Sequence, residues 1–263
     1  MTYLQEYRAL EPLAEAKKTT PGTGRSVYSS ERAAPALPEA ADLEGSIQQQ
    51  LDRQNVSEGR AFLAALPAAF TSLVFFDPQY RGVMDRQDYG NEGARQRGRS
   101  ALTQMTAEDI RQFFEGIARV LAPRGHLMLW VDKFHVAEGI GPWIAGLDLK
   151  IVDMVTWDKG RIGMGYRTRR RCEYLMVIQK LPVRAKGVWT RHDIPDVWLE
   201  KLPYSRSAHA HRKPVGFQTQ IIEAVTPPGG IVVDPAAGSF SVMTSAHAAG
   251  RHFLGCDLGS QSP

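Results

Sequence analysis

Strand-like apolar runs alternate with helical stretches from residue 56 onward, and this alternation limits the fold more than any other feature. The apolar runs lack a strict period of two, which is typical of strands buried on both faces. Such strands form a mostly parallel sheet with helices on both sides. The expected strands are 72–76, 126–131, 149–157, 172–179, 231–234 and 252–257, and the expected helices are 43–54, 58–66, 106–121, 214–225 and 241–249.

The end of the chain departs from the usual order of such a sheet. The alternation stops with the run that ends at Asp257, although a doubly wound half normally has a further strand there. The segment NVSEGRAFLAALPAAF, residues 55–70, lies just before the strand 72–76 and can supply the missing strand. We therefore expect an α/β fold with a circularly permuted sheet.

The region before residue 55 has a different composition. Residues 19–42 are rich in Ser, Thr, Pro, Ala and Gly, as in a flexible linker or wrapping arm. We therefore expect an N-terminal arm and linker, 1–54, followed by one domain, 55–263. The two cysteines, Cys172 and Cys256, are far apart in sequence and are interpreted as reduced thiols of a cytoplasmic protein, with a disulfide as the alternative.

Apolar segments are short throughout the sequence. No apolar run approaches the ~20 residues that a membrane-spanning helix needs, so no membrane partner is expected. The first residues, MTYLQEYRALEPLAEAKK, include acidic side chains and lack the apolar core of a secretory signal.

Positive charge is clustered rather than large. The formal net charge is +4, and five arginines fall within one Gly-rich segment, GRIGMGYRTRRR, residues 160–171. Basic clusters in loops favour a polyanionic partner, although a solvated surface is the alternative for either cluster alone. The second cluster comprises Arg206, His209, His211, Arg212 and Lys213.

The expected strand 72–76 ends on an unusual set of polar groups. The stretch SLVFFDPQYRG, residues 72–82, passes from four apolar residues directly to a carboxylate, a proline, an amide and a phenol. A strand that only has to stop uses Gly, Asn or another plain turn residue. This strand end is a candidate site for a polar, flat group, and a turn capped by Asp77 is the alternative if the motif stands alone.

A second candidate site follows the strand 231–234. The stretch IVVDPAAGSFSV, residues 231–242, has the order of a strand, an acidic turn, a glycine turn and a helix, as in a cofactor loop. Gly238 would let the backbone approach a ligand, and the helix N-terminus offers N–H groups. Asp257 lies roughly 20 residues past the glycine turn, where a ribose-binding carboxylate is expected. The turn lacks G-x-G-x-x-G, which disfavours an NAD-type oxidoreductase.

Several motifs follow one another in a distinctive order: DPQY, GHLMLWVDK, WDKGRIGMGYRTRRRCEYLMVIQK, HRKPVGFQTQIIEAVTPPGGIVVDPAAGSF and GRHFLGCD. In this order they resemble the beta class of amino-methylating DNA methyltransferases, in which a D-P-P-Y motif precedes the methyl-donor motif. The resemblance covers residues 55–258. It implies a Rossmann-like sheet, S-adenosyl-L-methionine as the cofactor and double-stranded DNA as the partner. It also implies transfer to the N6 amine of a flipped-out adenine.

The resemblance leaves related functions open. An aspartate at the start of DPQY favours adenine N6 over cytosine N4, because a serine is commoner there in cytosine-N4 enzymes of this class. An N4-cytosine enzyme and a catalytically idle DNA-binding relative are the alternatives. A homodimer and a cognate restriction endonuclease are further partners that the class allows.

Two parts of the central segment also match the class. Residues 181–210 fill the slot of the target-recognition region, and Trp189 and Trp198 within it are expected to pack rather than to stack on bases. The Trp-x-Lys element and the glutamate around the last hairpin of the sheet are matched by Trp157, Lys159, Glu173 and Lys180.

The resemblance assigns roles residue by residue, with three departures from the class pattern. Gln79 replaces the second proline, Ala236 replaces an aromatic residue and Phe240 replaces a glycine, so that Phe240 is expected to supply the apolar surface that Ala236 lacks. The implied residues are Asp77, Pro78, Gln79 and Tyr80 for catalysis; Phe76, Lys213, Pro214, Asp234, Pro235, Ala236, Gly238, Ser239, Phe240 and Asp257 for the cofactor; and Arg81, Arg95, Arg97, Arg161, Arg167, Arg169, Arg170 and Arg171 for DNA.

Overall fold

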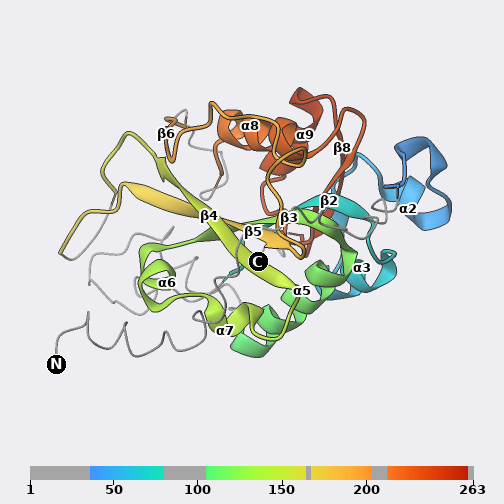
Figure 1. Ribbon diagram of the computed structural model, residues 1–263, viewed down its shortest axis with the longest axis horizontal. Coiled ribbons are helices and arrows are strands. Elements are labelled where there is room, and N and C mark those ends of the chain that lie inside the picture. The colour runs from blue at the N-terminus through green and yellow to red at the C-terminus, as the bar shows by residue number, and fades with distance from the viewer. Residues whose placement is uncertain (1–35, 80–104, 164–166, 203–211, 260–263) are drawn as a thin grey trace, which may run out of the picture. The chain divides into compact units, whose positions relative to one another are not determined.

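A computed structural model describes residues 36–79, 105–163, 167–202 and 212–259, all within the unit Ala34–Pro263 of the chain (Figure 1). In these residues eight strands form one sheet in the order β1-β8-β7-β2-β3-β5-β4-β6. The strands are β1 Asn55–Val56, β2 Thr71–Phe76, β3 Leu121–Val131, β4 Leu149–Asp158, β5 Cys172–Lys180, β6 Val197–Leu199, β7 Ile231–Asp234 and β8 His252–Asp257.

The sheet is parallel over most of its width. The strands β1, β8, β7, β2 and β3 run in the same direction, and β4 and β5 form an antiparallel hairpin beside β3. The short strand β6 pairs with β4 in parallel. The prediction of a mostly parallel sheet is therefore confirmed, with the hairpin as its antiparallel part.

The circular permutation is also confirmed. Asn55 pairs with Cys256 and Val56 with Asp257, so the segment that precedes β2 adds a strand beyond β8. The Asn55 side chain reinforces this pairing, because its Nδ2 donates to the Gly255 carbonyl at 2.9 Å.

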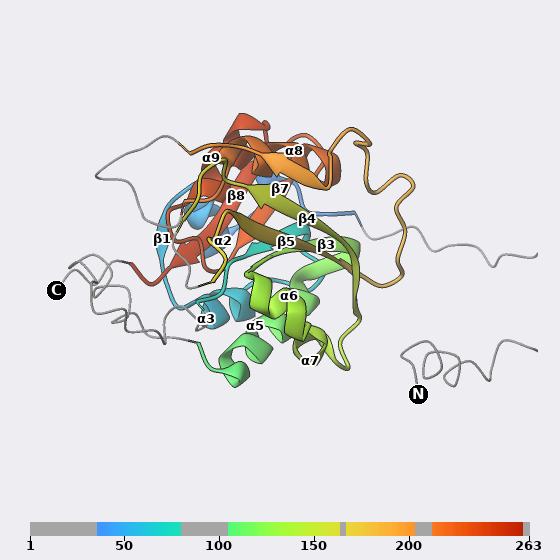
Figure 2. The same ribbon diagram turned by 90° about the vertical axis from the view of Figure 1, so that its left-hand side faces the viewer.

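Helices cover both faces of the sheet, as Figure 2 shows, with α8 and α9 on one side and α3, α5, α6 and α7 on the other. Side chains alternate along β2 in agreement with this: Val74 and Phe76 pack with α3 and α5, and Leu73 and Phe75 pack with α8 and α9. The helices are η1 Ala40–Asp42, α2 Gly45–Gln50, α3 Gly59–Ala65, α5 Ala107–Val120, α6 Lys133–Glu138, α7 Gly141–Ile144, α8 Val215–Val225 and α9 Ser241–Ala248.

The start of α5 shows the local chemistry that the sequence predicts. Thr106 is the N-cap, and its hydroxyl accepts a hydrogen bond from the Asp109 N–H at 3.1 Å, while the Asp109 carboxylate accepts from the Thr106 N–H at 2.8 Å. This reciprocal capping box satisfies two N–H groups that the first helical turn leaves without partners. Among the described residues no helix has the length and apolarity that crossing a membrane would require.

The described part of the predicted target-recognition region lies against the body of the protein. The Thr190 N–H donates to the Ala224 carbonyl of α8 at 2.9 Å, and Arg191 pairs with Glu223 at 2.7 Å. Trp189 contacts the ring of His126 edge-on at 5.8 Å, and Trp198 stacks on Phe217 at 5.4 Å. The packing interpretation of both tryptophans is therefore confirmed.

Candidate active site

The two candidate strand ends meet at one edge of the sheet. β2 and β7 are parallel neighbours, with Leu73 beside Val232 and Val74 beside Val233. Asp77 follows β2 and Asp234 ends β7, so both carboxylates lie at the carboxyl edge of the sheet. From β2 the sheet continues to β3 on one side, and from β7 to β8 on the other. Ligands of doubly wound folds bind at such a reversal of strand order.

Asp77 forms an ion pair with a lysine that comes from the opposite half of the chain. Lys213 Nζ lies 2.9 Å from Asp77 Oδ2, and the Asp77 side chain keeps 34% of its surface exposed. The removal of water from the rest of the carboxylate raises the pKa of Asp77, and the Lys213 ammonium opposes that rise. The carboxylate is thus both accessible and fixed.

Lys213 also contacts a second carboxylate. Its Nζ lies 2.9 Å from Glu173 Oε2, while Glu173 Oε1 lies 2.5 Å from Lys159 Nζ. The resemblance assigns Lys213 to the cofactor, whereas its ammonium lies on Asp77 and Glu173. All four residues of the array Asp77–Lys213–Glu173–Lys159 match class motifs, but the sequence does not show that they contact one another.

The loop after β7 begins with a buried carboxylate. Asp234 is 4% exposed, and its Oδ1 accepts a hydrogen bond from the Ala236 N–H at 3.1 Å. Burial raises the pKa of Asp234 well above its usual range, and the nearby carboxylates of Asp77 and Asp257 add to the rise. The Asp234 carboxylate therefore stabilises the turn that follows β7 through a hydrogen bond within the turn.

The glycine turn leaves room for a ligand. Gly238 has a φ of +52°, and a Cβ added there would meet no atom within 4 Å. Phe240, where the class has a glycine, has a left-handed backbone with a φ of 55° and caps α9. For a residue with a Cβ this conformation costs about 1–2 kcal/mol, and the Phe240 ring packs edge-on against Phe253 at 6.0 Å. Ala236 packs against the core on the opposite face of the sheet.

Asp257 is tied to the same turn. It ends β8, its Oδ2 accepts from the Gly238 N–H at 3.0 Å, and its Oδ1 accepts from the Gly259 N–H at 3.2 Å. A carboxylate has about four lone-pair sites, so capacity remains for two sugar hydroxyls. The open space at Gly238, the N–H groups at the start of α9 and this carboxylate fit a nucleoside cofactor.

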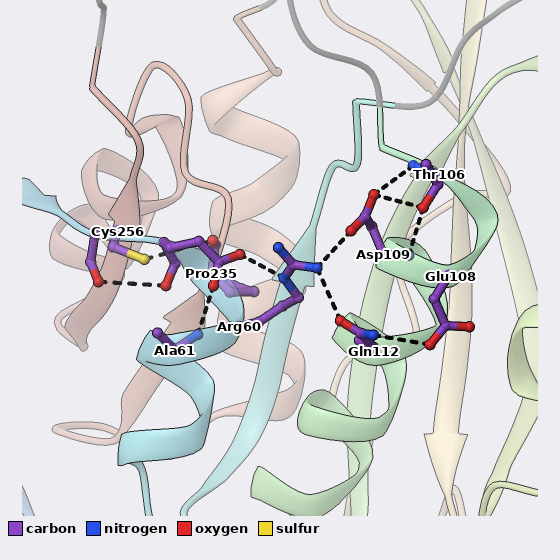
Figure 3. A network of polar contacts seen from close by, with 10 residues as sticks. Arg60, Ala61, Thr106, Glu108, Asp109, Gln112, Pro235 and Cys256 are labelled. Atoms are coloured by element: carbon purple, nitrogen blue, oxygen red, sulfur yellow. Dashed lines mark hydrogen bonds and ion pairs between the residues drawn. The ribbon is translucent and has the colours of Figure 1, made fainter.

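The start of α3 contacts the loop after β7 at Pro235, and Figure 3 shows Arg60 and Ala61 of this helix near Pro235. A Cβ on Gly59 would overlap the Pro235 carbonyl oxygen, so only glycine allows this contact. The Glu58 carboxylate caps α3 at the Ala61 N–H, 2.9 Å, and Arg60 links Glu58 to Asp109 of α5 at 2.8 and 2.6 Å. The sequence does not predict this support, because glycine near a helix start does not by itself indicate a close backbone contact.

Cys256 is a buried, free thiol, in agreement with the expectation of a reduced cysteine. Its Sγ lies 3.7 Å from the Pro235 carbonyl oxygen. Burial raises the pKa of Cys256 to about 12, so the thiol is neutral at physiological pH. Its role here is therefore packing.

The other residues predicted for the cofactor or for catalysis lie in the core, at the start of α8, in the glycine turn or directly after Asp77. The Phe76 side chain is 0% exposed and stacks on Phe113 at 4.9 Å, so it packs in the core and offers no surface to a ligand. Pro214 is the N-cap residue of α8, and Ser239 lies partly exposed in the glycine turn. Pro78 is buried and Gln79 is exposed directly after Asp77.

The basic segment divides into two groups. Arg171 pairs with Asp158 through two hydrogen bonds of 2.7 and 2.8 Å, and Arg170 lies 3.6 Å from Asp132. These two arginines form ion pairs with acidic neighbours. Arg161, Arg167 and Arg169 are exposed. The predicted Tyr80, Arg81, Arg95 and Arg97 lie outside the described residues.

Comparisons with known proteins agree with this geometry. Residues 71–262 match the N6_N4_Mtase family, described as DNA methylase. Type II methyltransferase M.HhaII of Haemophilus parahaemolyticus is 51% identical over 210 residues, which cover 79% of this chain and 91% of that protein.

Two solved structures share the fold at low sequence identity. The M1.HpyAVI–SAM complex has a TM-score of 0.56 at 15% identity, covering 80% of this chain and 94% of that one. The cytosine-N4-specific PvuII DNA methyltransferase has a TM-score of 0.60 at 14% identity, covering 78% and 80%. The chain therefore belongs to the N6/N4 DNA methylase family.

Proposed function

We propose that the protein methylates the N6 amine of an adenine that is flipped out of double-stranded DNA. The observation that carries this proposal is the position of Asp77, at the end of the strand next to the one that bears the donor loop. A base inside a duplex cannot bring its amine to such a site, so the base must leave the stack.

The amine is a weak nucleophile, because its lone pair is delocalised into the ring. The Asp77 carboxylate and the Pro78 carbonyl would accept the two amine hydrogens and localise the lone pair on nitrogen. Proline has a fixed φ and no N–H, so it holds its carbonyl in place without a competing donor. Tyr80 would provide the face on which the base stacks. Positioning and fixed dipoles would supply most of the acceleration.

S-adenosylmethionine, when bound, supplies a methyl group on a positively charged sulfur. Asp257 would hold its ribose hydroxyls, and the backbone at Gly238 would lie against it. The amine nitrogen forms the new bond to carbon as the carbon–sulfur bond breaks. The proton that the amine then loses passes to Asp77 or to water, and S-adenosylhomocysteine leaves.

Methylation of cytosine N4 is the second candidate, and the likeness to the cytosine-N4-specific PvuII enzyme favours it. The aspartate at position 77 favours adenine. We expect DNA treated with the protein and S-adenosylmethionine to contain N6-methyladenine when its nucleosides are analysed by mass spectrometry. N4-methylcytosine would select the second candidate. A lack of any methylated base, together with no S-adenosylmethionine binding by calorimetry, would indicate an idle DNA-binding relative.

The exposed arginines are proposed to hold DNA phosphates without reading sequence. Replacing Arg167 and Arg169 with alanine is expected to weaken DNA binding to a similar extent on every sequence, because phosphates are common to all. It should also lower the slope of log affinity against log salt by about two, one for each lost phosphate contact. Titrations by fluorescence anisotropy at several salt concentrations measure both effects.

The matched control is Lys150→Ala, because this exposed lysine lies at the start of β4, whereas the basic segment follows the end of that strand. The control should leave the salt slope unchanged. A changed sequence preference with no loss of affinity in the arginine variant would contradict the phosphate-holding role. Arg81, Arg95 and Arg97 belong to the same proposal.

We also propose that the protein acts in a restriction–modification system beside a cognate endonuclease. Its likeness to a type II methyltransferase supports this. Residues 181–210 would read bases together with the loop 81–104, the N-terminal arm 1–54 or a second subunit. Sedimentation with and without DNA would detect a homodimer.

A further inference from the structure

Four charged side chains of alternating sign form a continuous array beside the candidate active site. Asp77 follows β2, Lys213 precedes α8, Glu173 lies on β5 and Lys159 follows β4. The three contacts between successive members measure 2.9, 2.9 and 2.5 Å. Each member comes from a different part of the fold, so tertiary packing alone assembles the array.

We propose that Glu173 is a positioning residue for methyl transfer: by holding the Lys213 ammonium against Asp77, it fixes the carboxylate that accepts the amine hydrogens of the base. This inference rests on the proposed function of Asp77. Glu173 itself does not touch the base, and it positions Asp77 through its contact with Lys213.

The surroundings of Lys213 select one conformation of a flexible side chain. The lysine side chain is 11% exposed, and its ammonium lies 5.0 Å from the centre of the Trp130 ring, within the range of a cation–π contact. Glu173 provides a second anchor besides Asp77. Without it, the ammonium keeps Asp77 as a partner but loses the contact that fixes its direction.

The backbone that carries Lys213 is fixed as well. The Glu200 carboxylate accepts hydrogen bonds from the N–H groups of Gly216 and Phe217, at 3.0 and 2.8 Å, and so caps the first turn of α8. The Trp157 Nε1 donates to the Glu200 carbonyl at 2.9 Å and links this cap to β4. Both ends of the lysine side chain are therefore held by contacts with the rest of the fold.

The charges within the array act on Asp77 in opposite directions. Burial raises the pKa of Asp77, Lys213 lowers it, and the negative charge of Glu173 raises it, while Lys159 partly offsets Glu173. Asp234 on β7 also interacts with Asp77 through its charge. Burial alone would raise the pKa of Glu173, but Lys213 and Lys159 together hold it well below its usual range, so Glu173 stays ionised.

This arrangement predicts that variants of Lys213 and of Glu173 shift the pKa of Asp77 in opposite directions. Methyl transfer requires ionised Asp77, so the acid limb of the rate profile follows its ionisation. Lys213→Met removes the positive charge and should move that limb to higher pH. Glu173→Gln removes a negative charge and should move it to lower pH, while kcat on the plateau falls roughly hundredfold through misplacement of the carboxylate.

The experiment combines two measurements on wild type, Lys213→Met and Glu173→Gln. The first is the pH profile of kcat and of KM for S-adenosylmethionine. The second is a ¹³C NMR titration of the Asp77 carboxyl, which needs no activity. Lys150→Met and Glu138→Gln, both at exposed positions, are the controls and should match wild type in both measurements. Glu173→Asp should recover part of the kcat that Glu173→Gln loses.

A plateau kcat of Glu173→Gln equal to that of wild type would overturn the inference, and so would NMR shifts of the same sign in the two variants. If Lys213→Met does not fold, the direction of the Glu173→Gln shift decides by itself. If wild-type protein transfers no methyl group, the proposed function fails. The NMR titration then still decides whether the array holds Asp77.

Discussion

Replacing Asp77 with alanine is expected to abolish methyl transfer while S-adenosylmethionine still binds. The variant removes the carboxylate that accepts an amine hydrogen, and loss of such a positioned group reduces kcat by roughly 10³-fold or more. Lys213 keeps Glu173 as a partner, so no buried charge is left alone and the fold should persist. Single-turnover transfer of labelled methyl groups to DNA measures the first effect, and calorimetry with S-adenosylmethionine measures the second.

The control for this variant is Asp153→Ala, which removes an exposed carboxylate from β4. It should retain wild-type transfer. If Asp77→Ala retained transfer as well, Asp77 would have no part in the mechanism. If it lost S-adenosylmethionine binding to the same extent as transfer, Asp77 would belong to the donor pocket.

Of the substitutions proposed for this protein, Phe76→Ala is expected to lower the free energy of unfolding most. The ring is fully buried, stacks on Phe113 at 4.9 Å and meets Phe114 edge-on at 6.1 Å. Removing a buried phenylalanine ring costs about 3–5 kcal/mol of the free energy of unfolding, including the cavity that remains. Because Phe76 directly precedes Asp77, relaxation into that cavity should also displace the carboxylate and lower kcat.

Urea unfolding measures this loss as a lower midpoint with an unchanged slope. Phe134→Ala is the matched control, since this phenylalanine of α6 is partly exposed and should cost much less. Equal losses in the two variants would show that the core beneath Asp77 does not have the packing described here.

Local sequence patterns predict most of the described fold. The expected helix after Thr106 matches α5, which begins at Ala107 and ends at Val120. This helix can be predicted because its capping box and its apolar periodicity depend on residues that are close in sequence. The strand that Asn55 and Val56 form beside β8 is expected because the sheet needs a further strand there, and the strand propensity of these two residues does not indicate it. The expected strand 126–131 is too short, since β3 begins at Leu121. Pro123 and Gly125 are typical of a break before a strand, but here they lie within it.

The contacts within the site are less accessible to sequence reasoning. The meeting of Asp77 and Asp234 at one edge follows from parallel strands and can be predicted. The pairing of Lys213 with Glu173 cannot, because it depends on how long side chains from separate elements converge. The ion pairs of Arg170 with Asp132 and of Arg171 with Asp158 cannot be predicted either. A cluster of basic residues in the sequence does not indicate which acidic residues contact it.

A crystal structure of the protein with S-adenosylmethionine tests the central claim most directly. We expect the ribose hydroxyls on the Asp257 carboxylate, the donor against the backbone of Gly238, and the methyl group directed toward the Asp77 carboxylate. A donor bound with its ribose away from Asp257, or with its methyl group facing away from Asp77, would contradict the account.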